Sequence, residues 1–220
     1  MPTGRDVDAP RLTGIVLAGG VSTRLGEPKP LVVVGGRTVL ARIVAALHPV
    51  CAEIILAVSP GQSDATPETG LGLGMHVVLD RYPQAGPLAG LEVGLAAAAH
   101  GLAFLVAADH PFLSGALVRA MAAEASGAAY DAVVLAAGGR LQPLHGVYAP
   151  DVWAPLLRRA LDRGERSLYT MLRDGQRTGA PRVRVFDEPD ALRHDPDARS
   201  LFDIDTPDRL EEARRIAGGA

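Results

Sequence analysis

Short apolar runs recur along the chain at intervals that suit the buried strands of a sheet. Six runs have the length of a strand, at residues 14–18, 53–58, 76–79, 103–108, 131–137 and 183–186. Most are continuously apolar, which is typical of strands covered on both faces. Helical patterns lie between them, at residues 38–48, 88–100, 115–125, 151–163 and 167–174. A last helix is expected after Thr206, an N-cap residue type followed by Pro207 at the first helical position.

The alternation of strands and helices predicts an α/β fold with three Rossmann-like layers. We expect a mixed, mostly parallel sheet with helices on both faces. Residues 138–149 break the alternation, and their Gly-Gly pair predicts a hairpin with antiparallel pairing. The glycine-rich stretch 59–74 is predicted to be a mobile loop, and we assign it no chemistry.

The chain length and its termini set the expected domain organisation. The 220 residues suffice for one sizeable core and at most two small domains. We expect a flexible N-terminal tail over residues 1–12, which hold two Asp and two Pro and do not form a signal peptide, and a single domain over residues 13–220. No apolar run approaches the roughly 18–20 residues that a membrane span needs.

Charge and cysteine content narrow the class of protein further. The formal net charge is −3 and no long cationic block is present, so there is no electrostatic case for nucleic-acid binding, and any basic site must be local. Cys51 is the single cysteine, which excludes an internal disulfide. Together these features predict a cytoplasmic protein that binds neither nucleic acid nor membrane.

The stretch GIVLAGGVSTRLGEPKPL, residues 14–31, is the strongest candidate for a binding site. An apolar strand ends in Ala-Gly-Gly, and Ser22, Arg24 and Lys29 follow. Ligands of open parallel sheets bind beyond the carboxyl ends of the strands, where glycines let backbone amides approach an anion. We therefore expect a phosphate site here; the alternative is a tight surface turn with solvated cations. The stretch fits neither a Walker loop nor the GxGxxG dinucleotide fingerprint, which disfavours an NAD-dependent oxidoreductase.

Carboxylates at the ends of other apolar runs are candidate ligands. Asp80 ends one run, shortly before a Gly-Pro-Leu-Ala-Gly segment that opens a helix and could face an anion or a nucleobase. Asp109 follows the run at 103–108, where a carboxylate suits Mg²⁺; the alternative is that it caps the next turn. Asp203 and Asp205 alternate around Ile204 and could face one side, but each could also cap the last helix, and we favour capping for Asp203.

The remaining polar residues form weaker patterns. His110 and His145 fit no zinc spacing and are interpreted as ordinary loop or supporting residues. Ser167 is interpreted as an N-cap. Arg140, Gln142 and Arg166 are candidate contacts for an anionic acceptor, although exposed arginines are also common without a function.

The stretch LAGGVSTRLGEPK resembles the LAGG-x-S-x-R-[ML]-G-x-x-K signature of nucleotidyltransferases with a glycosyltransferase-A-like fold, the nucleotide-diphospho-sugar transferase type. Further segments resemble the molybdenum cofactor guanylyltransferase family in their order: GPLAG, a D-x-P after the fourth strand, QPLHGVY, GERSLYTML and a D-x-D-T-P near the end. The similarity covers roughly residues 13–213, nearly the whole chain.

This resemblance implies a function and a set of site residues. The implied reaction transfers GMP from GTP to the phosphate of molybdenum-bearing molybdopterin, with Mg²⁺ as cofactor and pyrophosphate as leaving group. Cofactor-delivery proteins are candidate transient partners. The residues implied to be catalytic are Lys29, Arg24 and Asp109; those implied to bind the nucleotide are Leu17, Ala18, Gly19, Gly20, Lys29, Asp80 and Asp109; those implied to hold the metal are Asp109 and Asp205.

One departure from the family pattern bears on the nucleotide. Members of this branch often carry Asn-x-Asn-Thr-Pro where this chain has Asp203-Ile-Asp205-Thr-Pro, and the Asp version occurs in relatives that transfer other nucleotides. The alternative activity is therefore the same chemistry with CTP or another phosphorylated acceptor. A non-catalytic nucleotide-binding regulator is the alternative of a different class, and the presence of Lys29 and Asp109 argues against it.

Overall fold

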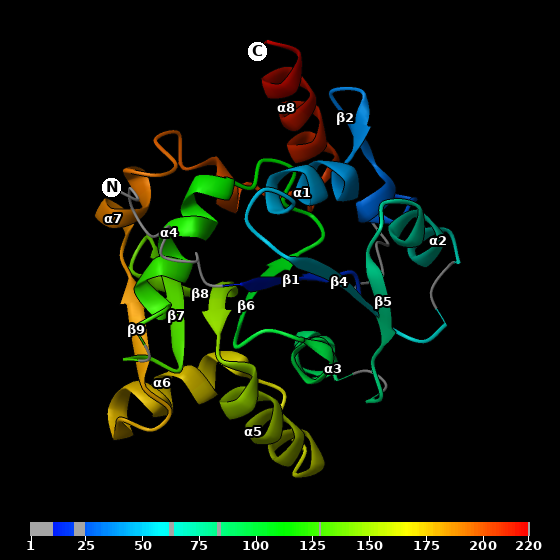
Figure 1. Cartoon of the computed structure of the whole chain (residues 1–220). Coiled ribbons are helices and arrows are strands. Elements are labelled where there is room, and N and C mark those ends of the chain that lie inside the picture. The colour runs from blue at the N-terminus through cyan, green and yellow to red at the C-terminus, as the bar shows by residue number, and fades with distance from the viewer. Residues whose placement is uncertain (1–10, 20–24, 62–63, 83–84, 128, 220) are drawn as a thin grey trace, which may run out of the picture.

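The computed structural model of the chain describes residues 11–219 except for residues 20–24, 62–63, 83–84 and 128. Its centre is a seven-stranded sheet in the order β5-β4-β1-β6-β8-β7-β9 (Figure 1). These strands are β1 (Leu12–Leu17), β4 (Glu53–Val58), β5 (His76–Leu79), β6 (Leu102–Ala107), β7 (Ala132–Ala137), β8 (Arg140–Tyr148) and β9 (Val183–Phe186). A separate small ribbon consists of β2 (Val33–Val34) and β3 (Arg37–Thr38).

The sheet is mostly parallel, as the sequence predicted. Strand β8 pairs antiparallel with β6 and with β7, whereas the other neighbouring strands of this sheet pair in parallel. The predicted Gly-Gly hairpin is the turn between β7 and β8, where Gly138 and Gly139 both have positive φ, a conformation that favours glycine. Because β8 runs against its neighbours, its first residues lie at the edge where the parallel strands end.

Helices cover both faces of the sheet, so the prediction of three layers is confirmed (Figure 1). Helices α1 (Val39–Leu47), α4 (Gly115–Ala125) and α8 (Pro207–Gly218) pack on one face, and α3 (Pro87–Ala97), α5 (Pro150–Asp162) and α6 (Leu168–Thr178) pack on the other. Side chains of β1 alternate between the two cores: Val16 belongs to the first, Ile15 and Leu17 to the second. This double burial explains why the strand sequences are continuously apolar.

Two of the predicted helix starts are confirmed by their caps. The Thr206 hydroxyl accepts a hydrogen bond from the Arg209 N–H at the start of α8. The Ser167 hydroxyl accepts one from the Thr170 N–H at the start of α6. Such caps satisfy backbone donors that have no partner within the helix.

Helix α3 lies unusually close to β1, and this contact shapes the edge of the sheet. A Cβ on Gly94 would lie 2.7 Å from the Ile15 Cγ2 atom, and one on Gly90 would lie 3.0 Å from the Leu17 Cδ2 atom. Side chains at these positions would push the helix away from the strand. The two glycines therefore bring the first turns of α3 over the end of β1.

Parts of the sequence prediction were wrong. The stretch 59–74 is not simply a loop, because it contains helix α2 (Ala65–Gly72), which packs against β4 and β5. The tail does not extend to residue 12, because β1 begins at Leu12 and this side chain is buried; residues 1–10 lie outside the described residues. The ribbon of β2 and β3 was not predicted.

The remaining described segments are short. They are the 3₁₀ turns η1 (Lys29–Leu31) and η2 (Arg199–Leu201) and helix α7 (Glu188–Leu192). In the described part of the chain, no helix combines the length and the apolar composition that crossing a bilayer requires.

Candidate functional site

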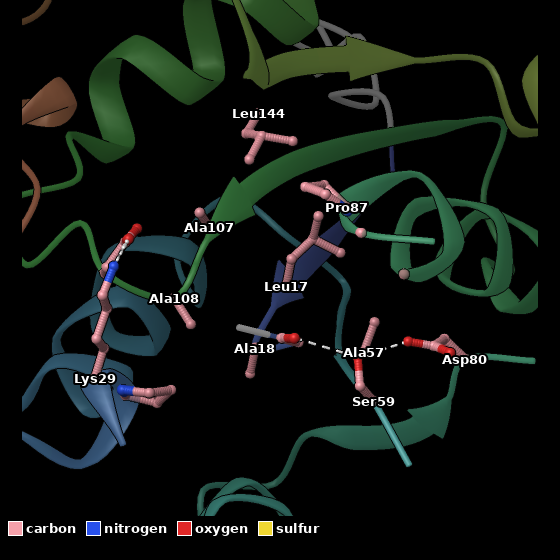
Figure 2. Close-up of a pocket in the computed structure, with 15 residues that line it drawn as sticks. Leu17, Ala18, Lys29, Ala57, Ser59, Asp80, Pro87, Ala107, Ala108 and Leu144 are labelled. Carbon is pink, nitrogen blue, oxygen red and sulfur yellow. Dashed lines mark hydrogen bonds and ion pairs between the residues drawn. The ribbon is translucent and has the colours of Figure 1, made fainter. Parts of the chain in front are cut away.

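A pocket of ≈ 290 Å³ lies beyond the carboxyl ends of β1, β4, β5 and β6 (Figure 2). Its lining comes from these strand ends, from η1, from the start of α3 and from β8: Leu17, Ala18, Gly19, Lys29, Pro30, Ala57, Ser59, Asp80, Gly86, Pro87, Gly90, Ala107, Ala108, Asp109 and Leu144. Open parallel sheets bind ligands at this edge because the loops that follow the strands converge there. The glycine loop that the sequence singled out begins in this pocket.

One side of the pocket carries a cation between two carboxylates. The Lys29 Nζ atom lies 3.0 Å from the Asp109 Oδ2 atom and also contacts the Asp205 Oδ1 atom. Asp109 follows the end of β6, and its carbonyl accepts a hydrogen bond from the Ile204 N–H at 3.2 Å, which holds the Asp205 segment beside it. Contacts that join residues 29, 109 and 205 thus bring three distant parts of the chain to one point.

The charges of this group reinforce one another. Burial disfavours a charged ammonium, but the hydrogen bonds and charges of Asp205 and Asp109 outweigh it and raise the pKa of Lys29 above its ordinary value of 10.5. Lys29 is therefore protonated at neutral pH. The Lys29 and Asp109 side chains are 26% and 18% exposed, so they are within reach of a ligand in the pocket.

The opposite side of the pocket carries a buried carboxylate. The Ser59 hydroxyl donates a 2.7 Å hydrogen bond to the Asp80 Oδ2 atom, and the Gly19 carbonyl lies 3.3 Å from the same hydroxyl (Figure 2). The Asp80 Oδ1 atom is buried and has no hydrogen-bond partner among the described residues. Because an unpaired buried acceptor is costly, this oxygen is suited to receive a donor from a ligand.

Apolar and small residues separate the two polar sides. Figure 2 shows Leu17 between Lys29 on one side and Asp80 on the other, with Ala107 and Leu144 above it. Pro87 opens α3 after Gly86, whose φ of +67° favours glycine. An apolar centre with polar groups at both ends suits a ligand that has a flat ring at one end and anionic groups at the other.

Two histidines support the Asp109 side of the site: His145 is fully buried, and His110 is partly buried. The His110 Nε2 atom lies 3.4 Å from the Asp109 Oδ1 atom, and the His110 ring packs edge-on against the His145 ring with 4.6 Å between centroids. Burial lowers the pKa of His110 below 6.5, so the contact with Asp109 is not an ion pair at neutral pH. His145 is a fully buried residue of β8, which agrees with the interpretation as a supporting residue and not with that as a loop residue.

The structure brings together most of the residues predicted for the site. Six of them line the pocket: Leu17, Ala18, Gly19, Lys29, Asp80 and Asp109. Asp205 joins them through its contact with Lys29. Gly20, Ser22 and Arg24 lie outside the described residues. What each residue does toward a ligand stays a prediction.

Asp203 does not cap the last helix, because Thr206 does so. The Asp203 Oδ1 atom instead accepts a hydrogen bond from the Asp205 N–H at 3.2 Å, and its Oδ2 atom lies 3.5 Å from the Arg209 Nη2 atom. Asp203 therefore shapes the turn that carries Asp205.

The candidate acceptor residues lie beyond the pocket lining. Arg140 is exposed at the start of β8, at the same edge of the sheet as the pocket. Arg166 follows α5, and the Tyr82 hydroxyl, just beyond β5, donates a 3.0 Å hydrogen bond to Asp162 at the end of that helix. This bond joins the end of α5, where the α5–α6 connection begins, to the segment that follows β5. The Arg166 Nη1 atom donates a 2.9 Å hydrogen bond to the Glu165 carbonyl.

Sequence reasoning missed Ser59, the partner of Asp80. Ser59 lies in the stretch interpreted as a loop without chemistry, yet it directly follows β4. Its position after a buried apolar strand was the available signal, the same one that pointed to Asp80 and Asp109. Leu144 was missed because nothing local shows that β8 returns to the pocket edge.

The residues near Lys29 fit a magnesium ion in part. Asp109 and Asp205 offer carboxylate oxygens, which are the hard donors that Mg²⁺ prefers, and the Asp109 Oδ1 atom is buried without a hydrogen-bond partner among the described residues. Among all the described residues of the chain, no group of three or more His, Cys, Asp or Glu side chains is arranged so that it could hold a metal. Mg²⁺ is commonly held by one or two carboxylates together with substrate phosphates, and two carboxylates suffice for that mode.

Comparison with known proteins identifies the family. The model of the MobA-like NTP transferase domain matches residues 14–178. A probable molybdenum cofactor guanylyltransferase of Pelotomaculum thermopropionicum is 35% identical over 207 residues, covering 93% of each chain. A molybdenum cofactor guanylyltransferase of Bradyrhizobium sp. is 34% identical over 211 residues, covering 93% of this chain and 92% of the relative.

A solved structure supports the same fold. Molybdopterin-guanine dinucleotide biosynthesis protein A from Archaeoglobus fulgidus superposes with a TM-score of 0.79 at 22% identity, over 94% of this chain and all of that one. This likeness and the two relatives confirm the fold and the family that the sequence motifs indicated. The chain belongs to the MobA-like NTP transferase family and is a nucleotidyltransferase of the molybdenum cofactor guanylyltransferase group.

Proposed function

We propose that this chain transfers GMP from GTP to the phosphate of molybdenum-bearing molybdopterin, forming molybdopterin guanine dinucleotide. An oxygen of the acceptor phosphate forms a bond to the α-phosphorus of GTP, and the bond from that phosphorus to the bridging oxygen breaks, so that pyrophosphate leaves with the electron pair. The observation that carries the proposal is a single pocket with different polar groups on its two sides. One side has the buried Asp80 carboxylate, which can accept hydrogen bonds from a ligand, and the other has the Lys29 ammonium beside two carboxylates.

The Lys29 side of the pocket suits the triphosphate. A charge-assisted hydrogen bond from an ammonium to a phosphate is worth roughly 1.5–3 kcal/mol, and Lys29 is charged at neutral pH. Asp109 and Asp205 would hold Mg²⁺, which supplies neutralisation of phosphate charge when it is bound. Lys29 orients the phosphates and stabilises the charge that develops on pyrophosphate. We propose the same role for Arg24 on the basis of the sequence.

The Asp80 side suits the nucleoside. Guanine presents two neighbouring donors, the ring N1–H and the exocyclic amino group, and a carboxylate oxygen without a partner accepts from such donors. Ser59 holds one oxygen of Asp80 and leaves the other for the ligand. The small residues Ala18, Gly19 and Ala57 leave room for a flat base between the two sides.

The acceptor fits at the part of the edge formed by the β7–β8 turn, the first residues of β8 and the α5–α6 connection. Arg140, Gln142 and Arg166 come from these segments, and guanidinium groups suit the oxyanions of a phosphorylated pterin that carries molybdate. No general base is required, because a phosphate nucleophile is ionised at neutral pH. The task of the protein is to align two anions that repel each other.

A comparison of four nucleotides tests the proposal. The melting temperature is measured with GTP, ATP, CTP or UTP and Mg²⁺, because a ligand that binds only the native state raises it. At a concentration one hundred times the dissociation constant, GTP is expected to raise the melting temperature by about 5–10 °C, from roughly 2.7 kcal/mol of added stability. Pyrophosphate release with GTP and molybdenum cofactor then measures transfer. If CTP and not GTP raised the melting temperature and supported pyrophosphate release, the activity would be cytidylyl transfer and the proposal would be wrong.

A further inference from the structure

The ammonium of Lys29 occupies the place between the two carboxylates to which we assigned the metal. Its Nζ atom lies 3.0 Å from the Asp109 Oδ2 atom and is hydrogen-bonded to the Asp205 Oδ1 atom as well. Lys29 comes from η1, Asp109 from the loop after β6 and Asp205 from the turn before α8. The contact therefore joins three segments that only folding brings together, and it is not an ion pair between neighbours in the sequence.

The two carboxylates need a cation between them. Like charges held close together repel each other, and an interposed positive charge removes the repulsion. Lys29 meets this need in the protein without ligands, through its contacts with both acids. A divalent cation that approached the same oxygens would meet the ammonium at short range.

The Lys29 ammonium cannot keep its hydrogen bonds to both carboxylates and at the same time direct all of its N–H donors to a triphosphate. An ammonium has three donors in a compact group, and two are directed to Asp109 and Asp205. A polyphosphate that draws Lys29 toward itself removes the Lys29 ammonium from its contacts with the two acids. The same polyphosphate provides the further oxygens that complete a magnesium shell.

We propose that Lys29 is a placeholder cation that keeps free divalent metal away from Asp109 and Asp205 until a polyphosphate displaces it. This inference rests on the proposed function, because it assumes that the pocket takes a nucleoside triphosphate. Metal then binds the carboxylates only together with the nucleotide, so the enzyme does not hold an idle metal ion. By linkage, exchange of Lys29 for the metal couples the affinity for nucleotide to that for metal.

Binding of free Mn²⁺, measured by electron paramagnetic resonance without nucleotide, tests the proposal. Lys29→Met removes the charge at similar length, and we expect it to bind Mn²⁺ at least tenfold more tightly than the natural chain. Lys29→Arg keeps the charge and is expected to bind Mn²⁺ as weakly as the natural chain. Arg209→Met is the matched control, because Arg209 pairs with Asp203 in the same turn; its Mn²⁺ affinity is expected to stay within twofold.

Several results would overturn the inference. Equal Mn²⁺ affinity in the natural chain and folded Lys29→Met would show that Lys29 does not exclude the metal. An equal rise in both Met variants would show that net charge, and not the contact, controls affinity. Tighter binding by Lys29→Met should disappear when Asp109→Asn is added; if it persists, the metal binds elsewhere.

A second measurement uses the natural chain and does not depend on how a variant folds. Lys29 is the only lysine in the sequence, so ¹⁵N-labelled lysine gives a single side-chain ammonium signal in the NMR spectrum. The signal is expected to stay in place with Mg²⁺ alone and to shift when Mg²⁺ and inorganic tripolyphosphate are added together. A shift with Mg²⁺ alone at low millimolar concentration would refute the placeholder role.

Tripolyphosphate also separates this inference from the proposed function. It carries no base, so its effect on Lys29 does not depend on which nucleotide or acceptor the enzyme uses. If tripolyphosphate moves the signal but no GMP transfer occurs, the placeholder role stands and the proposed function fails. If transfer occurs but the signal moves with Mg²⁺ alone, the proposed function stands and the placeholder role fails.

Discussion

The replacement Asp80→Asn tests how the pocket selects its nucleotide. Asp80 is 7% exposed, its Oδ2 atom accepts from the Ser59 hydroxyl at 2.7 Å, and its buried Oδ1 atom has no partner among the described residues. Asparagine keeps the size of the side chain and can still accept from Ser59 through its carbonyl oxygen. Its amide NH₂ group then lies where the carboxylate oxygen was, so a donor replaces an acceptor at the position facing the ligand.

The expected cost follows from this change of polarity. A hydrogen bond to a charged acceptor contributes roughly 1.5–3 kcal/mol, and about 1.4 kcal/mol corresponds to a factor of ten. We therefore expect kcat/KM for GTP to fall by about 10- to 150-fold. The melting temperature should stay the same or rise, because the buried negative charge is removed while the bond to Ser59 is kept.

Steady-state kinetics with GTP, ITP and 2′-deoxy-GTP locate the contact. ITP lacks the exocyclic amino group, so the natural chain should prefer GTP over ITP, and the variant should lose that preference. Asp174→Asn is the matched control, since it makes the same chemical change at an exposed ion pair of α6. An unchanged preference for GTP over ITP in the variant would refute the base contact. A changed response to 2′-deoxy-GTP instead would place Asp80 at the ribose.

Three further predictions concern other parts of the site. Asp109→Asn should remove most turnover and leave the melting temperature near that of the natural chain, because one negative charge at the metal is lost; near-normal turnover at limiting Mg²⁺ would contradict this role. Arg166→Ala should lower the affinity for the pterin acceptor, measured by pterin fluorescence, about tenfold or more, and leave the affinity for GTP, measured by calorimetry, unchanged. A loss of GTP affinity with unchanged acceptor affinity would show that the nucleotide and acceptor sites have been assigned the wrong way round. Burial holds the pKa of His145 well below 6.5 and also lowers that of His110 beside it, so the unfolded chain binds protons that the folded chain does not. Stability against urea should thus be full above pH 6.5 and fall below it, by at most about 1.4 kcal/mol per pH unit for each histidine; an equal slope in His145→Phe would show that His145 contributes nothing.

Local patterns along the chain determined most of the secondary structure and the position of the site. Continuous apolar runs marked the buried strands because a strand covered on both faces must be apolar throughout. Thr206 and Ser167 marked helix starts because a cap bonds within the same turn. The glycine loop, Asp80 and Asp109 marked the pocket because each directly follows a strand whose end lies at the binding edge.

Helix α2 shows where local patterns failed. Its sequence is rich in glycine and carries no apolar face, so the segment was interpreted as a loop. The helix packs closely on β4, where a Cβ on Gly70 would lie 2.5 Å from the Leu56 Cδ2 atom. Packing of the helix backbone against a buried strand stabilises it, and no periodicity in the segment itself reports that contact.

The pairings inside the site were decided by the tertiary structure alone. Ser59 meets Asp80 because β4 and β5 are neighbours in the sheet, and Lys29 meets Asp205 across a separation of 176 residues. Side-chain chemistry identified acids and cations as candidates, but a sequence states neither which strands are adjacent nor where a loop returns. The order of the strands brought Ser59 and Asp80 together, and the path of the chain before α8 brought Asp205 to Lys29.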